Sequence, residues 1–335
     1  MSLSSTSCDI LLGMQTHWRR LLRAVRWIPV CAAPVLLLAG CDRTGSGESG
    51  DSSVAARTPS RSDSMATTVS SSGWDVAAGP FVVLPTVDGG MVAGSLLLPE
   101  ASDTTVGDTV GVGALLGDGR LDLFSRGGRV GGARLTVEAS VVADPACSAW
   151  PVARLAVDAG VALPPWTAAF ASGRITAVPL DSIEGMAPRD SARLAADLTR
   201  LASKLPDDTS ATFRALPFVV LRAWQSRGLD SGVVVATLAR RVNQEDDPKE
   251  ERLVLVVEAP TDKGSTWTVG WHERAAGHEE ELVVAEPLLA FRAVGARDVR
   301  LLFGRDDGVA LGAAVLSRQG GVWRVLWESA IAGCN

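Results

Sequence analysis

The sequence predicts a mainly β protein made of antiparallel meanders, arranged as a sandwich or a propeller-like fold, with one amphipathic helix near residues 189–205. Residues 74–335 contain many short runs that are β-branched or alternate apolar with polar side chains. These runs recur at a spacing of roughly 10 to 15 residues and are separated by glycine-containing turns, a pattern typical of antiparallel strands. Only one stretch has the apolar spacing of a helix.

The β-branched and alternating runs define the expected strands. The clearest is near the C-terminus, where Trp323, Val325 and Trp327 share one face of a strand because side chains alternate. The expected strands are residues 82–84, 91–98, 109–116, 132–142, 218–224, 232–242, 253–258, 267–273, 282–285, 299–303, 309–317 and 323–328.

One helix is expected between two prolines. Its leucines fall on a single stripe, with Pro188 near the start and Pro206 after the end. A leucine stripe of this kind faces a core, so we expect the helix to pack on a sheet. The stripe consists of Leu194, Leu198, Leu201 and Leu205.

A change of composition separates this body from the N-terminal part of the chain. Residues 42–73 are rich in Ser, Gly, Thr and Asp and contain few large apolar side chains. Such a segment cannot bury enough apolar surface to offset the entropy of ordering. We expect a flexible tether with a span of roughly 30 Å. Residues 74–335 are then one β-rich domain, or two that divide near the helix.

The first 41 residues resemble the signal region of bacterial lipoproteins. Four arginines precede an apolar run over residues 27–38, and Leu38-Ala39-Gly40-Cys41 matches the lipobox. The resemblance implies that residues 1–40 are a signal peptide and that Cys41 carries acyl chains such as palmitate. It implies a body at the cell envelope that faces the periplasm or the exterior, with inner and outer membrane both open.

An uncleaved transmembrane helix is the alternative interpretation of this region. It would need about 20 consecutive apolar residues, whereas this run is shorter and contains Pro29 and Pro34. The start codon is also open between Met1 and Met14.

Cysteine usage and charge agree with export. Removal of residues 1–40 and acylation of Cys41 leave Cys147 and Cys334, which we expect to form a disulfide, with two buried thiols as the alternative. The whole chain has a net charge of −6. Loss of four arginines and one aspartate with residues 1–40 makes this about −9, which argues against a nucleic-acid partner.

Catalytic motifs are scarce. The chain contains no tyrosine, and Walker, dinucleotide-binding and HExxH patterns do not occur. The best local constellation is a hairpin with Ala275-Ala276-Gly277 at its tip, which would bring His272, His278 and Glu280 near a divalent metal such as zinc. A solvated, charged hairpin tip is the alternative, and we predict no cofactor.

Two acidic segments are candidate calcium-binding sites. Residues 245–251 lack the oxygen spacing of a calcium loop, so we expect an acidic surface loop. Residues 117–124 resemble the GDGRLDL core of FG-GAP/VCBS-type propeller repeats, in which Asp118, Gly119 and Asp122 match the calcium loop. Ala114 and Leu116 stand in place of its earlier ligands.

These observations favour a lipid-anchored envelope protein with a non-catalytic role in binding or assembly. Its partners would be the membrane, through Cys41, and an envelope protein or a glycan. One alternative is a carboxylate-based hydrolase acting on glycans, which two close carboxylates in a cleft would favour. Another is a divalent-metal-binding envelope protein. An apolar patch or exposed sheet edge would favour the binding module, and most tryptophans are expected in the core.

Overall fold

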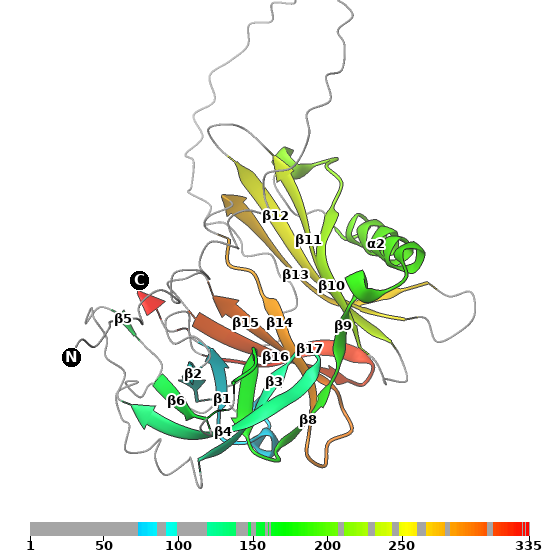
Figure 1. Ribbon diagram of the computed structural model, residues 1–335. Helices are drawn as coiled ribbons and strands as arrows, with labels where there is room; N and C mark the ends of the chain where they lie inside the picture. Colours follow the sequence, from blue (N-terminus) through cyan, green and yellow to red (C-terminus); the bar gives the residue numbers. More distant parts are fainter. Residues whose placement is uncertain are drawn as a thin grey trace, which may run out of the picture. The chain divides into compact units, whose positions relative to one another are not determined.

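The computed structural model confirms a mainly antiparallel β fold, with one α-helix in the part of the chain it describes (Figure 1). The described residues all fall within one compact unit, Arg61–Asn335. The expected signal region, Cys41 and residues 42–72 of the expected tether lie outside them. The described residues are 73–85, 92–98, 119–138, 147–148, 152–157, 160, 162–206, 211–226, 232–242, 248–259, 266–278, 282–306, 311–329, 331 and 333–334.

The first strands close into a six-stranded barrel, in the order β1-β2-β6-β4-β3-β7. Its interior is filled by Val83, Leu96, Leu121, Leu123 and other apolar side chains. A glycine enables one contact, because a Cβ on Gly94 of β2 would lie 2.5 Å from the carbonyl oxygen of Leu84 on β1. The strands are β1 (Val82–Pro85), β2 (Ala93–Leu97), β3 (Arg120–Ser125), β4 (Gly128–Glu138), β6 (Val152–Ala156) and β7 (Ala168–Ala171).

Two five-stranded sheets follow, each a four-strand meander with one added edge strand. The outer sheet has the order β13-β12-β11-β10-β9, with strands Leu180–Ser182 (β9), Val219–Ser226 (β10), Val233–Val242 (β11), Lys249–Glu258 (β12) and Thr268–His278 (β13). The central sheet has the order β17-β16-β15-β14-β8, with strands Ile175–Val178 (β8), Glu286–Ala293 (β14), Arg300–Asp306 (β15), Leu311–Gln319 (β16) and Val322–Glu328 (β17).

One short segment contributes an edge strand to both sheets. β8 pairs with β14 in the central sheet, and β9 pairs with β10 in the outer sheet. Only Pro179 separates the two strands. Proline lacks a backbone N–H and is suited to a position between two ladders.

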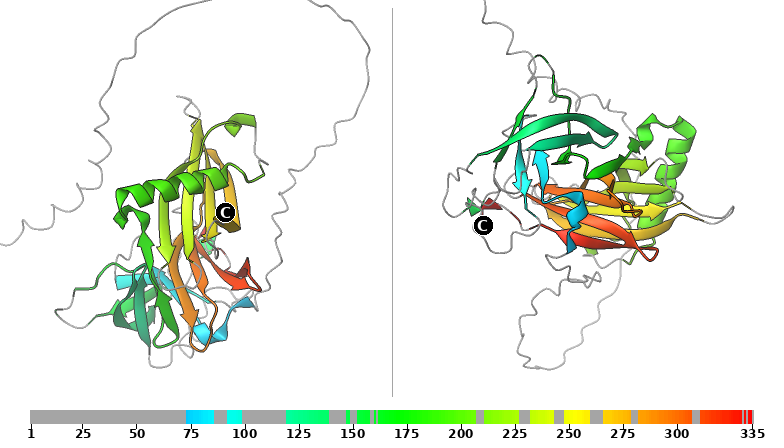
Figure 2. Two further views of the ribbon diagram at one scale, coloured as in Figure 1. Left: turned by 90° about the vertical axis from the view of Figure 1, so that its right-hand side faces the viewer. Right: turned by 90° about the horizontal axis from the view of Figure 1, so that it is seen from below.

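Alternating side chains of these strands build four layers. Val233 and Val235 of β11 face the central sheet, whereas Val234 and Ala236 face the helix. In the central sheet, Ala290 faces the outer sheet and Phe291 faces the barrel. The layers therefore follow the order helix, outer sheet, central sheet, barrel (Figure 2). Of the two expected arrangements, sandwich and propeller, the two five-stranded sheets form a sandwich.

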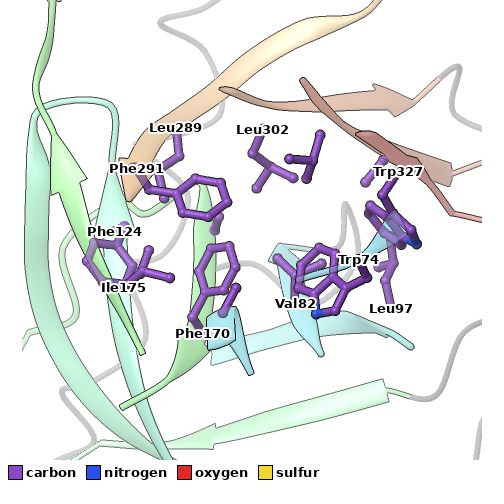
Figure 3. Close-up of a cluster of buried hydrophobic side chains, with 14 of the residues drawn as sticks. Trp74, Val82, Leu97, Phe124, Phe170, Ile175, Leu289, Phe291, Leu302 and Trp327 are labelled. Carbon is purple, nitrogen blue, oxygen red and sulfur yellow. The ribbon is translucent and has the colours of Figure 1, made fainter. Parts of the chain in front are cut away.

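The barrel and the central sheet share one apolar core, which we call the junction core. Figure 3 shows Phe124 and Phe170 of the barrel beside Phe291 and Leu289 of β14. Trp74 packs edge-on against Trp327 of β17, with ring centroids 4.7 Å apart. The prediction that most tryptophans are in the core is confirmed, because five of them are buried: Trp74, Trp166, Trp224, Trp323 and Trp327.

The expected helix is present as α2 (Pro188–Ala202), and it packs on the outer sheet. Pro188 occupies its first turn, and Leu194 and Leu198 are buried. The helix ends three residues before Leu205, which still packs against the same core. Short 3-10 turns lie at Val76–Ala78 (η2), Ile183–Gly185 (η4) and Ala211–Phe213 (η5). No helix in the described ranges is both long and apolar enough to cross a membrane.

Several strands differ from the expectation. Strands β3 and β6–β9 were not predicted, because all five are only three to six residues long and most lack clear alternation. Residues 282–285 were expected to be a strand, but β14 begins at Glu286. The expected strand 109–116 lies outside the described residues. Two two-residue strands, β5 (Cys147–Ser148) and β18 (Gly333–Cys334), form a separate small sheet.

Candidate functional site

The structure does not bring the two histidines of the expected metal site together. Residues 275–277 form no hairpin turn, because β13 runs without interruption from Thr268 to His278. His272 pairs with Leu255 and His278 with Lys249 along β12. Six residues of strand separate their Cα atoms by about 20 Å, too far for one ion. Glu280 lies outside the described residues. Within the described ranges, no three side chains of His, Cys, Asp or Glu are grouped so that they could hold a metal ion.

The second half of the acidic run 245–251, which was expected to be a surface loop, instead begins a strand, and residues 245–247 lie outside the described residues. Residues 249–251 belong to β12, and Glu250 and Glu251 are fully buried. Glu251 receives Arg240 Nε at 2.5 Å and Arg274 at 3.0 Å. The guanidinium of Arg240 also lies over the Phe218 ring, 4.7 Å from its centroid. The surface-loop prediction was therefore wrong for these two residues, because arginines on neighbouring strands neutralise their charge.

Glu250 has its own pair of arginines on the other face of the sheet. Arg241 Nε lies 2.5 Å from its carboxylate, and Arg252 also donates to it. Consecutive strand residues point to opposite faces, so Glu250 and Glu251 cannot flank one glycosidic bond. The buried carboxylates thus form two separate ion-pair clusters and give no support to the hydrolase alternative.

Asp122, the second aspartate of the propeller-like segment, lies on β3 and points to the face opposite Leu121 and Leu123, away from the barrel interior. Its carboxylate accepts hydrogen bonds from Gly173 N at 2.8 Å, Arg129 Nε at 2.8 Å and Ser172 Oγ at 3.1 Å. Burial raises the pKa of Asp122, but these hydrogen bonds and the charge of Arg129 outweigh it and hold the pKa below its usual value. The calcium role implied by the resemblance is not supported, since the carboxylate already has three protein partners. Asp118 lies outside the described residues.

A pocket of about 310 Å³ lies between the barrel and the central sheet, and we call it the junction pocket. Its wall is mostly apolar, with three polar side chains from Arg126, Thr167 and Glu286. Its volume is at the small end of the range for ligand sites. The remaining lining residues are Leu84, Pro85, Trp166, Val284, Leu288, Gly304 and Leu311.

Arg126 links three layers of the molecule at this pocket. It lies in the turn between β3 and β4, and its Nε donates to the carbonyl oxygen of Pro287 at 2.7 Å. Its guanidinium also pairs with Glu286 of the central sheet and lies over the ring of Trp224 in the outer sheet, 4.9 Å from the centroid. Nearby, Thr167 Oγ1 donates to the carbonyl oxygen of Leu288 at 2.7 Å. These contacts fix the pocket's polar side.

An open strand edge lies beside this pocket. β9 pairs only with residues 224–226 of β10, so residues 219–222 have no strand on that side among those described; we call them the β10 edge. Val219 is 60% exposed and Leu221 is 38% exposed. Arg222 of this edge lies 3.5 Å from the Glu286 carboxylate that lines the pocket. The β10 edge and the junction pocket are thus adjacent.

No protein-family model, no curated protein and no solved structure matches this chain. The interpretation of the site therefore depends on its geometry. Sequence reasoning missed Arg126, Glu286 and the β10 edge, because their contacts join positions far apart in the chain. The one local indication was the Arg126-Gly127-Gly128 turn, in which a lone arginine stands between a strand and two glycines.

The structure pairs the two strands that carry Cys147 and Cys334. Cys334 of β18 is the direct partner of Cys147 of β5 in an antiparallel pair. The expected disulfide therefore stays a prediction, now with a backbone register that agrees with it.

Proposed function

We propose that the chain is a lipid-anchored envelope protein whose β-rich body binds an extended segment of a partner protein at the β10 edge, without catalysis. The observation that carries this proposal is the open edge itself. A strand edge presents unpaired N–H and C=O groups, and proteins usually protect such edges with charges, prolines or covering segments. The β10 edge carries the charged Arg222 and a bulge at Leu221, but it also exposes two apolar side chains, Val219 and Leu221. An added partner strand would pair with the backbone and cover both side chains.

The junction pocket would give this binding its specificity. Strand addition supplies affinity through the backbone, whereas pockets select individual side chains. The pocket wall of Trp166, Leu288 and Leu311 suits an apolar side chain. At its rim, Arg126 and Arg222 share the single carboxylate of Glu286, which leaves one excess positive charge. We therefore expect the partner segment to combine a bulky apolar residue with an acidic one.

The lipid anchor would place this surface near a membrane. Its support is the match of residues 38–41 to the lipobox. Several acyl chains on one cysteine give effectively permanent attachment, because each buried CH₂ contributes about 0.8 kcal/mol. Residues 42–73 would then allow the body to reach a partner anchored elsewhere in the envelope.

Mass spectrometry of the protein from its native host tests the anchor. We expect a mature N-terminus at an acylated Cys41, and loss of the protein from the membrane fraction after Cys41→Ala. An uncleaved, unmodified N-terminus in the soluble fraction would refute the anchor.

Site-specific photocrosslinking tests the binding surface. A photoreactive benzoylphenylalanine replaces Leu221 in the full-length protein in its host, and the matched control carries it at Val294, which is 57% exposed after β14. We expect a discrete protein adduct from position 221 and none from position 294. A Val219→Lys change in the same protein should abolish the adduct. Equal labelling at the two positions, or none at 221, would contradict the proposal.

A further inference from the structure

The small sheet formed by β5 and β18 joins two distant parts of the fold. β5 lies in the connection between barrel strands β4 and β6, and β18 follows β17 of the central sheet. Its register pairs Gly333 with Ser148 and Cys334 with Cys147. The two cysteines are therefore opposite one another in the small sheet.

This backbone geometry suits a disulfide. Directly paired residues of antiparallel strands have Cα atoms about 4.5 or 5.5 Å apart, depending on the type of pair. Disulfides are compatible with Cα separations of about 4.4 to 6.8 Å. Both kinds of antiparallel pair fall within that range, so no backbone movement is needed.

The backbone hydrogen bonds between β5 and β18 contribute little stability by themselves. Two-residue strands contribute very few ladder bonds, and an isolated two-stranded pair is marginal in water. A covalent bond between the paired cysteines would supply the missing stabilisation.

We infer that Cys147 and Cys334 form a disulfide that acts as a covalent staple between the barrel and the C-terminal end of the central sheet. Formation removes one proton and one electron from each thiol and creates the S–S bond. The electrons and protons pass to a disulfide oxidant, whose own S–S bond becomes two thiols. Such oxidants act outside the cytoplasm, so the bond's presence in cells rests on the proposed envelope location.

The staple has a structural consequence that the cysteine count alone does not predict. The barrel and the central sheet also meet at the junction core and enclose the junction pocket between them. A disulfide that ties the β4–β6 connection to the chain after β17 opposes their separation. It would thereby hold the pocket residues Leu84 of β1 and Leu288 of β14 in place relative to each other.

Equilibration with glutathione tests the pairing independently of where the protein resides. The purified full-length protein is held in buffers of varied glutathione redox ratio, quenched with acid, and mapped for the peptide that links Cys147 to Cys334. The same protein in 8 M urea serves as the unfolded reference. We expect an effective thiol concentration at least about 100-fold higher in the folded protein. Equal values in the two states would overturn the staple even if the lipid anchor is confirmed.

Hydrogen exchange tests what the staple does. We expect amides of β1 and β14 at the junction to exchange faster after reduction, and equally fast in a Cys147→Ser/Cys334→Ser variant that needs no reductant. The control Ser148→Ala leaves both thiols intact and should exchange like the oxidised wild type. If the oxidised and reduced proteins exchange at the same rate at β1 and β14, the bond has no structural role at the junction.

Discussion

Arginine provides most of the positive charge inside this molecule. Arg240 is buried, pairs with Glu251 and lies over the face of Phe218. A planar guanidinium can form a directed ion pair with one edge while its face stacks on an aromatic ring, which an ammonium group cannot do. Glu251 is buried with Arg240 and Arg274. Removal of any one of these three charges would leave an uncompensated charge in the interior and lower the stability of the fold.

The substitution Glu251→Gln measures that dependence. It leaves Arg240 and Arg274 facing a neutral amide in a buried site. Breaking a buried ion pair in this way costs about 3–5 kcal/mol, so we expect a large decrease in the free energy of unfolding in urea. Glu328→Gln is the matched control, since the Glu328 side chain is 50% exposed and pairs with Arg305 at the surface. The control should cost less than about 1 kcal/mol, and similar losses for both would contradict the prediction.

The lowered pKa of Asp122 predicts how the free energy of unfolding changes with pH. Its folded-state pKa is lowered, so its contribution to stability is present above the unfolded-state pKa of about 3.9. That contribution is lost as the pH falls through the lower folded-state pKa. We expect Asp122→Asn to be less stable than the wild type at pH 6, and the difference to shrink by pH 3. Urea unfolding at the two pH values checks this, and a constant difference would show that the carboxylate's charge contributes nothing.

Elements with strong local patterns were predictable, and those defined by distant partners were not. The leucine stripe around Leu194 and Leu198 indicated α2, because helical spacing shows in the sequence itself. β8 and β9 were missed because Ile175–Ser182 is short, is interrupted by Pro179, and obtains its pairing from strands far along the chain. The acidic run 249–251 was misassigned since its neutralising arginines lie on other strands.

The candidate site was less predictable than the fold. Arg126, Glu286 and Arg222 belong to the barrel, the central sheet and the outer sheet, and only packing of the layers unites them. The histidine hypothesis failed for a related reason. A glycine after two alanines suggested a turn at residues 275–277, but pairing with β12 keeps that segment extended.

Closure of the barrel depends on a glycine where β1 meets β2. A Cβ on Gly94 would meet the Leu84 carbonyl oxygen at 2.5 Å and a Val83 methyl at 2.8 Å. Because backbone cannot move aside cheaply, Gly94→Ala should lower the free energy of unfolding by about 1–3 kcal/mol. Gly131→Ala in β4 is the control, since a Cβ there meets nothing within 4 Å. Urea denaturation of the two variants decides, and an unchanged midpoint for Gly94→Ala would count against the steric argument.

At the scale of the whole molecule, each sheet belongs to two cores at once. Leu302 of β15 lies in the junction core, while its neighbours Leu301 and Phe303 face the outer sheet. Loss of one layer therefore exposes apolar surface of the next. The four layers should act as one cooperative structure rather than as independent domains.

Equilibrium unfolding of the full-length protein checks that cooperativity. Tryptophan fluorescence reports on tertiary packing in several layers, because buried tryptophans lie in the junction core, in the barrel and between the two sheets. Far-ultraviolet circular dichroism reports on the sheets and α2. We expect the two signals to give one coincident transition in urea. Two separated transitions would show that the barrel unfolds independently of the sandwich.

The segment Ile175–Ser182 also limits how the gene can change length. Its first half is in register with β14 and its second half with β10, and Pro179 is the only residue between them. A codon inserted or deleted there would force one half to slip by one position, which turns every side chain of that half to the opposite face. Hairpin loops elsewhere can vary in size without this penalty. Related genes should therefore vary in length at their turns and keep this eight-residue stretch constant.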